Sequence, residues 1–272
     1  MRQTVEPILE ISDLQTHFFT KAGILRAVDG VSFEIGAGEI VGLVGESGSG
    51  KSITGFSIIG LVDSPGEIIG GTIKFKGEDL NDLSNEQMQH VRGNRIAMIF
   101  QDPMMTLNPV LRIETQMIEA IQAHDNKISR EDARIRSRDA LGLVGISSPD
   151  ERLRAYPHQF SGGMRQRVSI AIAMLNRPDL IIADEPTTAL DVTIQGQVIS
   201  EMQKLCRETK TALLWITHDL AVIAGIADRV CVMYAGRIVE QGLVANTIAN
   251  PLHPYTRGLM GSVPSQNQRG KP

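Results

Sequence analysis

Eight consecutive residues in the first fifth of the chain have the types and spacing of a phosphate-binding loop. They match the pattern G-x-x-x-x-G-K-[ST], in which glycines let the backbone turn tightly and direct its N–H groups toward an anion. Lys51 can reach the β- and γ-phosphates of a nucleotide, and Ser52 offers a hydroxyl ligand to Mg²⁺. We therefore predict binding of ATP and Mg²⁺ by Gly45, Glu46, Ser47, Gly48, Ser49, Gly50, Lys51 and Ser52.

Two adjacent carboxylates, Asp184 and Glu185, end an apolar run over residues 180–183. An apolar strand that ends in Asp can deliver the carboxylate to Mg²⁺ beside the phosphate loop. Adjacent strand residues point to opposite faces, but a turn at the strand end would direct Glu185 toward the γ-phosphate, where it could act as a general base on water. Alone, the pair could simply cap the next helix. Together with the phosphate loop, it favours nucleotide hydrolysis.

A second anion site is predicted at Ser161, Gly162 and Gly163, where a helix over residues 165–176 begins. A Ser at a helix start accepts from free backbone N–H groups, and the partial positive charge there attracts phosphate. On its own this segment could be an ordinary helix cap.

The hydrophobic pattern predicts an α/β fold. Short continuous apolar runs over 40–45, 95–102, 179–186 and 211–219 are typical of strands buried on both faces, and a helix begins near Lys51. Further strands are predicted over 8–18 and 27–35, with a helix over 192–208 and a hairpin over 229–242 that turns at Ala235–Gly236.

The motifs in this order resemble those of ABC transporter ATPases. Phe160-Ser161-Gly162-Gly163 stands where the family signature reads LSGG, shortly before the acidic pair. Gln101 matches the Q-loop of the family, Asp191 its D-loop and His218 its H-loop; either Phe18 or Phe19 could be the aromatic that stacks on adenine, and Phe19 is the one we carry forward.

The resemblance implies a P-loop NTPase cassette with a RecA-like mixed sheet core, an N-terminal antiparallel β subdomain and an inserted helical subdomain. It covers one ABC ATPase domain over residues 8–264. Within it, the α/β core would comprise 8–102 and 159–245 and the helical subdomain 103–158, followed by a Pro-rich extension over 246–272 with a disordered end.

The resemblance also implies a mechanism, in which two cassettes face each other head to tail around ATP. Catalytic roles would fall to Glu185, His218, Gln101 and Lys51, and Mg²⁺ would be held by Ser52, Gln101 and Asp184. Ser161, Gly162 and Gly163 would serve the ATP of the opposite cassette, and Asp191 is a further candidate nucleotide-binding residue.

Three segments resemble one branch, the dipeptide/oligopeptide/nickel importer ATPases: FQDPMMTLNP, FSGGMRQR and HPYTRGLMGSVP. Met164, where the general signature has Gln, is typical of this branch. Members often continue into a cysteine-containing tail; no cysteine follows Cys231 here, so we expect no iron–sulfur cluster.

The partners implied by this resemblance are two transmembrane permease subunits, a second ATPase in a heterodimer or homodimer, and, indirectly, an extracytoplasmic solute-binding protein. Peptides, nickel, glutathione and opines remain open as solutes. The alternatives are an ABC exporter or lipoprotein-release ATPase, against which the HPYT segment argues, and a soluble ABC ATPase in DNA repair or translation, which would typically carry two cassettes or a long coiled coil.

Composition agrees with action at the cytoplasmic face of the membrane through partners. The formal net charge of −4 and 4% aromatic content argue against non-specific nucleic-acid binding. The N-terminus has no apolar run behind a basic start, and no apolar stretch approaches the roughly 18 residues of a membrane span. Cys206 and Cys231 are expected to be buried, reduced hydrophobes.

Overall fold

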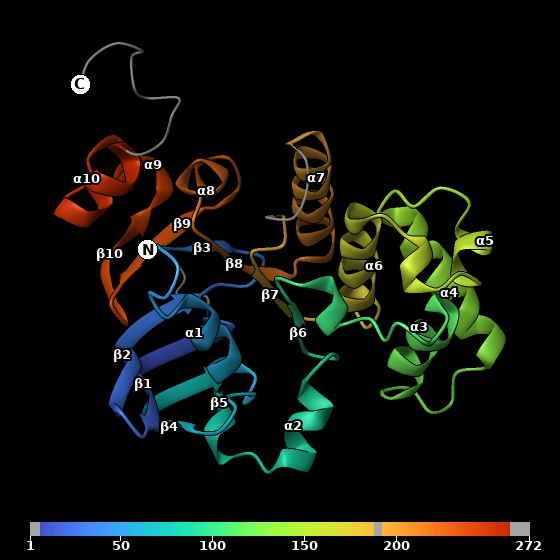
Figure 1. The fold of residues 1–272 in the computed structure, drawn as a ribbon, viewed down its shortest axis with the longest axis horizontal. Coiled ribbons are helices and arrows are strands. Elements are labelled where there is room, and N and C mark those ends of the chain that lie inside the picture. Colours follow the sequence, from blue (N-terminus) through green and yellow to red (C-terminus); the bar gives the residue numbers. More distant parts are fainter. Residues whose placement is uncertain (1–5, 188–191, 262–272) are drawn as a thin grey trace. The chain divides into compact units, whose positions relative to one another are not determined.

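Two parallel-stranded regions carry the predicted motifs in this computed structural model, which describes residues 6–187 and 192–261. The chain divides into two units, one made of Met1–Met88 with Ala212–Pro272 and the other of Gln89–Thr211. The predicted α/β class is confirmed, since strands and helices are present in both (Figure 1). The two units are described in turn.

The first unit contains an antiparallel sheet (Figure 1, blue to teal) in the order β2-β1-β4-β5. The two strands predicted near the N-terminus are both present, the second beginning earlier than expected. Helix α1 (Lys51–Ile58) is tied to this sheet by a 2.8 Å hydrogen bond between the hydroxyl groups of Ser57 and Thr16, both buried. The strands are β1 (Leu9–Thr20), β2 (Gly23–Ile35), β4 (Gly66–Phe75) and β5 (Glu78–Asp79).

The same unit holds a second set of strands in the order β10-β9-β3-β8, in which β3 runs parallel to both β8 and β9. Every residue of β3 and β8 is buried, as predicted for strands covered on both faces. These strands are β3 (Ile40–Val44), β8 (Ala212–Thr217), β9 (Arg229–Tyr234) and β10 (Arg237–Leu243).

The predicted hairpin is formed by β9 and β10. Its turn residues, Ala235 and Gly236, have φ angles of 46° and 81°. Positive φ at both central residues matches the twist of a two-residue hairpin, so the prediction of the turn is confirmed.

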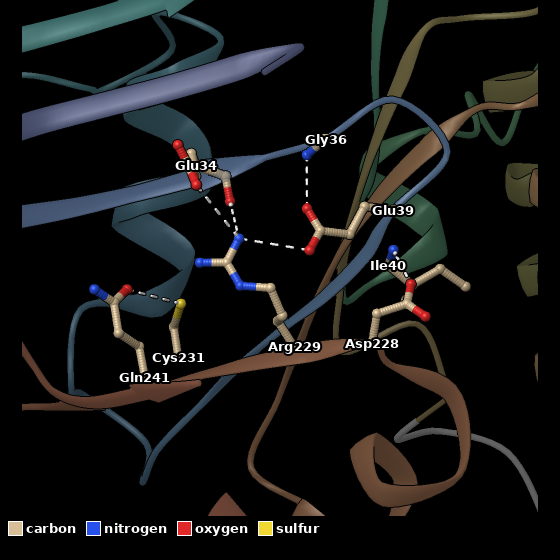
Figure 2. Close-up of polar contacts among 8 residues, drawn as sticks. All are labelled: Glu34, Gly36, Glu39, Ile40, Asp228, Arg229, Cys231 and Gln241. Carbon is tan, nitrogen blue, oxygen red and sulfur yellow. Dashed lines mark hydrogen bonds and ion pairs between the residues drawn. The ribbon is translucent and has the colours of Figure 1, made fainter. Parts of the chain in front are cut away.

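Polar contacts tie the beginning of β3 to the beginning of β9 (Figure 2). The Asp228 carboxylate accepts a hydrogen bond from the N–H of Ile40 at 2.9 Å. Next to it, the Arg229 guanidinium donates to the Glu34 carbonyl at 3.3 Å and to the Glu39 carboxylate at 3.5 Å. The strand that leads into the phosphate loop is therefore fixed at its amino end.

Both cysteines are buried, as predicted. Burial raises the pKa of Cys206 and of Cys231 to about 12, so both thiols stay protonated. Cys231 also lies 3.7 Å from the Gln241 amide oxygen (Figure 2). This is the behaviour of small core residues.

The remaining helices of the first unit are short. Helix α8 follows β8, and two more helices follow β10 near the C-terminal end. Their bounds are α8 (Leu220–Ile226), α9 (Val244–Ala249) and α10 (Pro254–Gly261), while α2 (Asn85–Val91) follows β5.

The second unit pairs two parallel strands, β6 (Ile96–Ile99) and β7 (Leu180–Asp184), and in its described residues α3 to α7 follow β6 in the chain or flank β7. Helix α4 contacts α3, α5 and α6, so the inserted segment forms a helical cluster (Figure 1, green to yellow). None of the helices within 6–187 and 192–261 is long and apolar enough to cross a membrane. The five are α3 (Ile113–Gln122), α4 (Arg130–Leu143), α5 (Pro149–Leu153), α6 (Gly162–Met174) and α7 (Val192–Thr209).

Candidate functional site

The predicted phosphate loop joins the end of β3 to the start of α1. Gly50 is the residue before the helix and has a φ of 106°, which side-chain-bearing residues rarely adopt. A Cβ atom added at Gly50 would lie 2.2 Å from the Ala27 carbonyl oxygen. The glycine is thus required twice, by backbone conformation and by the close approach of β2.

The other end of the loop rests on the β9–β10 hairpin. A Cβ at Gly45 would lie 2.2 Å from the Met233 carbonyl oxygen, and the N–H of Gly236 donates to the Ser49 carbonyl at 2.9 Å. This role of the hairpin could not be predicted from the sequence, because local patterns do not indicate contacts between segments so far apart in the chain.

Lys51 is almost completely buried, with 5% of its surface exposed. Its ammonium group donates to the carbonyl oxygens of Gly45 and Glu46, each at 2.8 Å. The loop residues Glu46, Ser47 and Gly48 are exposed. The lysine is therefore held inside the loop by backbone acceptors, while the outer rim of the loop faces solvent.

His218 directly follows β8 in the same unit. The register of the parallel pair places Thr217 opposite Val44, so His218 lies level with Gly45, the first residue of the phosphate loop. Its side chain is exposed. The next residue, Asp219, caps α8 by accepting from the N–H of Ala221 at 2.8 Å, which fixes the chain direction just after the histidine.

The two phenylalanines at the end of β1 differ in environment. The Phe18 ring is half-buried, and a Cβ at Gly66 would lie 2.7 Å from it. Phe19 points to the other face of the strand and is 44% exposed. Phe18 is therefore occupied by packing inside the protein, and Phe19 is the ring available to a ligand.

In the second unit, Gln101 and Glu185 follow neighbouring parallel strands. The register pairs Ile99 with Ala183, and the Gln101 amide donates to the Glu185 carboxylate at 3.2 Å. Glu185 has a φ of 45°, which is costly for a non-glycine residue, whereas the preceding Asp184 is 3% exposed. The chain does turn where the strand ends, as expected.

The predicted second anion site is the start of α6. The Ser161 hydroxyl caps the helix by accepting from the N–H of Met164 at 3.3 Å. Ser161 and Gly162 are exposed, and a Cβ at Gly162 would meet no atom within 4 Å. Asp191, the D-loop candidate, lies outside the described residues.

The candidate Mg²⁺ ligands are chemically suited to that ion. Ser52, Gln101 and Asp184 offer a hydroxyl, an amide and a carboxylate oxygen, all hard donors. Within the described ranges, no three His, Cys, Asp or Glu side chains gather as an all-protein metal site would require. A nucleotide-bound Mg²⁺ needs no such cluster, because phosphates and water supply most of its ligands.

A buried-lysine phosphate loop, an acidic strand end and a second glycine-bearing helix start together define a nucleotide-hydrolysing cassette. Residues 28–188 match the family model described as ABC transporter, and residues 239–271 match the model described as oligopeptide/dipeptide transporter, C-terminal region. The chain belongs to the ABC transporter family and is an ATP-binding, ATP-hydrolysing cassette.

Individual relatives agree with this assignment. A probable peptide ABC transporter ATP-binding protein of Sinorhizobium fredii is 51% identical over 97% of this chain and 78% of its own length. The oligopeptide transport ATP-binding protein AppD of Bacillus subtilis is 52% identical over 94% of this chain and 78% of its own length.

The fold also matches solved cassettes. A dimeric post-hydrolysis state of the ATP-binding cassette MJ0796, bound to ADP and Pi, superposes with a TM-score of 0.79 at 26% identity, covering 87% of this chain and 98% of that chain. The predicted ABC cassette fold is therefore confirmed.

Proposed function

We propose that this chain is the ATPase subunit of an importer that takes up di- or oligopeptides, or a related small solute, across the cytoplasmic membrane. The observation that carries the proposal is the match of residues 239–271 to a C-terminal region of oligopeptide/dipeptide transporters, after the ABC transporter match over residues 28–188. The names of the relatives, which are peptide transport ATP-binding proteins, support the same solute class.

Each site residue has a role in ATP hydrolysis under this proposal. Lys51 binds the β- and γ-phosphates, and Ser52, Gln101 and Asp184 supply oxygen ligands to Mg²⁺. Bound Mg²⁺ neutralises charge on the phosphate oxygens. The 3.2 Å hydrogen bond from Gln101 to Glu185 supports their acting together on the attacking water.

The aromatic and histidine candidates complete this set. Phe19 stacks on adenine, which its exposure supports, and His218 contacts the γ-phosphate, which its place level with the start of the phosphate loop supports. Residues Gly45, Glu46, Ser47, Gly48, Ser49 and Gly50 present their backbone to the phosphates.

The start of α6 serves a partner cassette. Ser161, Gly162 and Gly163 bind the γ-phosphate of ATP held by a second ATPase subunit, and Asp191 is a further nucleotide-binding candidate. The exposure of Ser161 and Gly162 and the open space around Gly162 support this role. We propose that the partner is a different ATPase chain, which would make the pair a heterodimer; a homodimer is the alternative.

Two permeases complete the assembly, and the cassette acts at the cytoplasmic face of the membrane.

We propose one ABC ATPase domain over 8–264, with a core of 8–102 and 159–245 and an extension over 246–272. The segment 103–158 acts as the helical subdomain that meets the permeases. Gln101, just before it, reports the γ-phosphate to that subdomain, in the manner of a ligand-biased switch.

The test is the Mg²⁺-dependent ATPase activity of the purified chain, first alone and then with its permeases and partner ATPase in lipid vesicles. Addition of a solute-binding protein loaded with peptide should raise turnover above both. A basal activity that ignores permeases and peptide but responds to DNA or ribosomes would overturn the transport proposal.

A further inference from the structure

A tyrosine from the C-terminal helix α10 touches the phosphate loop. The hydroxyl oxygen of Tyr255 accepts a hydrogen bond from the backbone N–H of Glu46 at 2.8 Å, although the two residues are 209 positions apart. The Tyr255 ring lies against the ring of Tyr234, with centroids 4.5 Å apart and planes tilted by 46°. A residue outside the phosphate-binding motif thus contacts its second position.

Glu46 is also one of the two residues that hold Lys51. Its carbonyl oxygen accepts from the Lys51 ammonium at 2.8 Å, while its N–H is held by Tyr255. Glu46 is otherwise an exposed loop residue. The tyrosine therefore restrains the backbone at the residue that supplies one of the acceptors for the lysine.

The placement of Tyr255 is itself reinforced on the preceding strand. The Glu240 carboxylate on β10 accepts from the N–H groups of Leu252 and His253, at 2.8 and 3.0 Å. The His253 ring nitrogen Nδ1 then accepts from the N–H of Tyr255 at 3.2 Å. These three bonds fix the entry to α10, so the phenol arrives at Glu46 from a defined direction.

The phenol is neutral at ordinary pH. Burial raises the pKa of Tyr255 above its usual value, and the hydrogen bond from Glu46 offsets this only in part. A neutral hydroxyl uses one lone pair for the Glu46 N–H and adds no charge near the loop.

We propose that Tyr255 is a positioning residue for ATP binding, which acts through Glu46 to hold Lys51 in the orientation that receives the β- and γ-phosphates. The inference rests on the proposed role of Lys51. A loop that is ordered before the nucleotide arrives loses less freedom on binding, so the bond favours affinity. The C-terminal segment thereby acts on the nucleotide site of its own chain.

The experiment compares ATP affinity in the purified full chain and in three variants: Tyr255→Phe, Tyr234→Phe and Lys51→Ala. Tyr255→Phe keeps the ring and removes the acceptor. Tyr234→Phe is the matched control, because the Tyr234 hydroxyl takes part in none of the hydrogen bonds seen among residues 6–187 and 192–261. The equilibrium constant for ATP and the melting temperature with and without ATP are measured for each protein.

We expect Tyr255→Phe to weaken ATP binding by about threefold to tenfold, the loss that one neutral hydrogen bond produces. The melting temperature without ATP should stay within about 2 °C of the parent, while the rise caused by ATP becomes smaller. A purely structural role would instead lower the melting temperature of the free chain. The KM for ATP should rise with kcat little changed, because the lost contact serves binding.

Three outcomes would overturn the inference. Tyr255→Phe could bind ATP like the parent while Lys51→Ala loses binding, which would remove the role of Tyr255 and leave the proposed function intact. Tyr234→Phe could weaken binding as much as Tyr255→Phe, which would assign the effect to the ring pair. Lys51→Ala could bind ATP normally, which would remove the proposed role of Lys51 as well.

A second measurement does not depend on the variants being equally stable. Amide hydrogen exchange in the unmodified chain should show protection of the Glu46 N–H, in contrast to the neighbouring exposed residues Ser47 and Gly48. Exchange at Glu46 as fast as at those neighbours would contradict the hydrogen bond on which the inference depends.

Discussion

The helices α1 and α6 both begin with glycine-bearing segments that can face an anion, yet their glycines are needed for different reasons. At α1, Gly50 has a positive φ and lies so close to Ala27 that the chain itself excludes any side chain. At α6, Gly162 has open space around its missing Cβ. The fold explains the first glycine, whereas no atom within 4 Å requires the second.

The two helices also differ in whether a side chain caps their first turn. No side chain caps α1, whose N-cap residue is Gly50. At α6, the Ser161 hydroxyl already accepts from Met164. The two helix starts therefore differ in their capping, and under our proposal α1 serves the nucleotide of this chain and α6 that of a partner cassette.

The largest expected effect separates binding from turnover. Glu185→Gln keeps the shape of the side chain but removes the general base, so turnover in the assembled complex should fall by about 10²- to 10⁴-fold while ATP binding by the free chain is unchanged. ATPase rates and ATP affinity are measured side by side, with Glu201→Gln, an exposed carboxylate of α7, as control. Normal turnover in Glu185→Gln would remove the base assignment.

The next prediction tests the first half of the comparison. Gly50→Ala should lower the free energy of unfolding by about 2–4 kcal/mol and abolish measurable ATP binding, because it adds both positive-φ strain and a collision with the Ala27 carbonyl. Gly77→Ala is the matched control, since Gly77 has a φ of 83° but no atom within 4 Å of an added Cβ.

The control should lose only about 1 kcal/mol and retain ATP binding. Chemical denaturation and ATP titration distinguish the two variants. Equal losses in both would mean that positive φ alone explains Gly50 and that the contact with β2 adds nothing.

The open space around Gly162 at the start of α6 leads to a prediction about the ATPase rate of the assembled transporter, not about the free chain. Gly162→Ala should leave the free energy of unfolding within about 0.5 kcal/mol and leave ATP binding by the free chain unchanged, since the added methyl meets nothing. In the assembled transporter, we expect an ATPase rate about tenfold lower, because the methyl would lie where the partner's phosphate must approach the helix start.

Gly142→Ala, in the last turn of α4 and also without an atom within 4 Å of an added Cβ, is the control and should change neither property. An unchanged ATPase rate for Gly162→Ala in the complete assembly would show that α6 does not approach the bound nucleotide of the partner.

The same distinction explains how much of the site could be predicted from the sequence. Gly45 and Asp184 can be found because each lies at the end of a short, fully buried strand, and Lys51 because it begins the helix after the glycine-rich loop; each of these is a local pattern. The strained turn at Glu185 was also foreseeable, since the strand ends there. These features depend on neighbours in sequence, and the structure confirms their local arrangement.

Features that depend on distant segments could not be predicted in this way. Whether Phe18 or Phe19 is free for a ligand depends on which face of β1 meets Gly66, a pairing with a strand more than forty residues away. Tyr255 reaches Glu46 only because β10 and α10 return to the phosphate loop. The HPYT motif marked the family in the sequence but gave no sign of this contact.

The smallest expected effect concerns the support that the phosphate loop before α1 receives from the C-terminal segment. Burial raises the pKa of Glu240, but hydrogen bonds, the largest of them from the N–H of Leu252, more than offset it, so the pKa lies below its ordinary value. A lowered pKa stabilises the fold above that ordinary value, and the stabilisation is lost as the pH falls through the pKa of the folded state. Glu240→Gln should therefore melt about 2 °C below the parent at pH 7, and the difference should close as the pH falls through that lowered pKa. Glu67→Gln, an exposed carboxylate on β4, should match the parent at pH 7. A difference for Glu240→Gln that stayed constant from pH 7 to pH 3 would mean that the carboxylate charge does not hold the entry to α10.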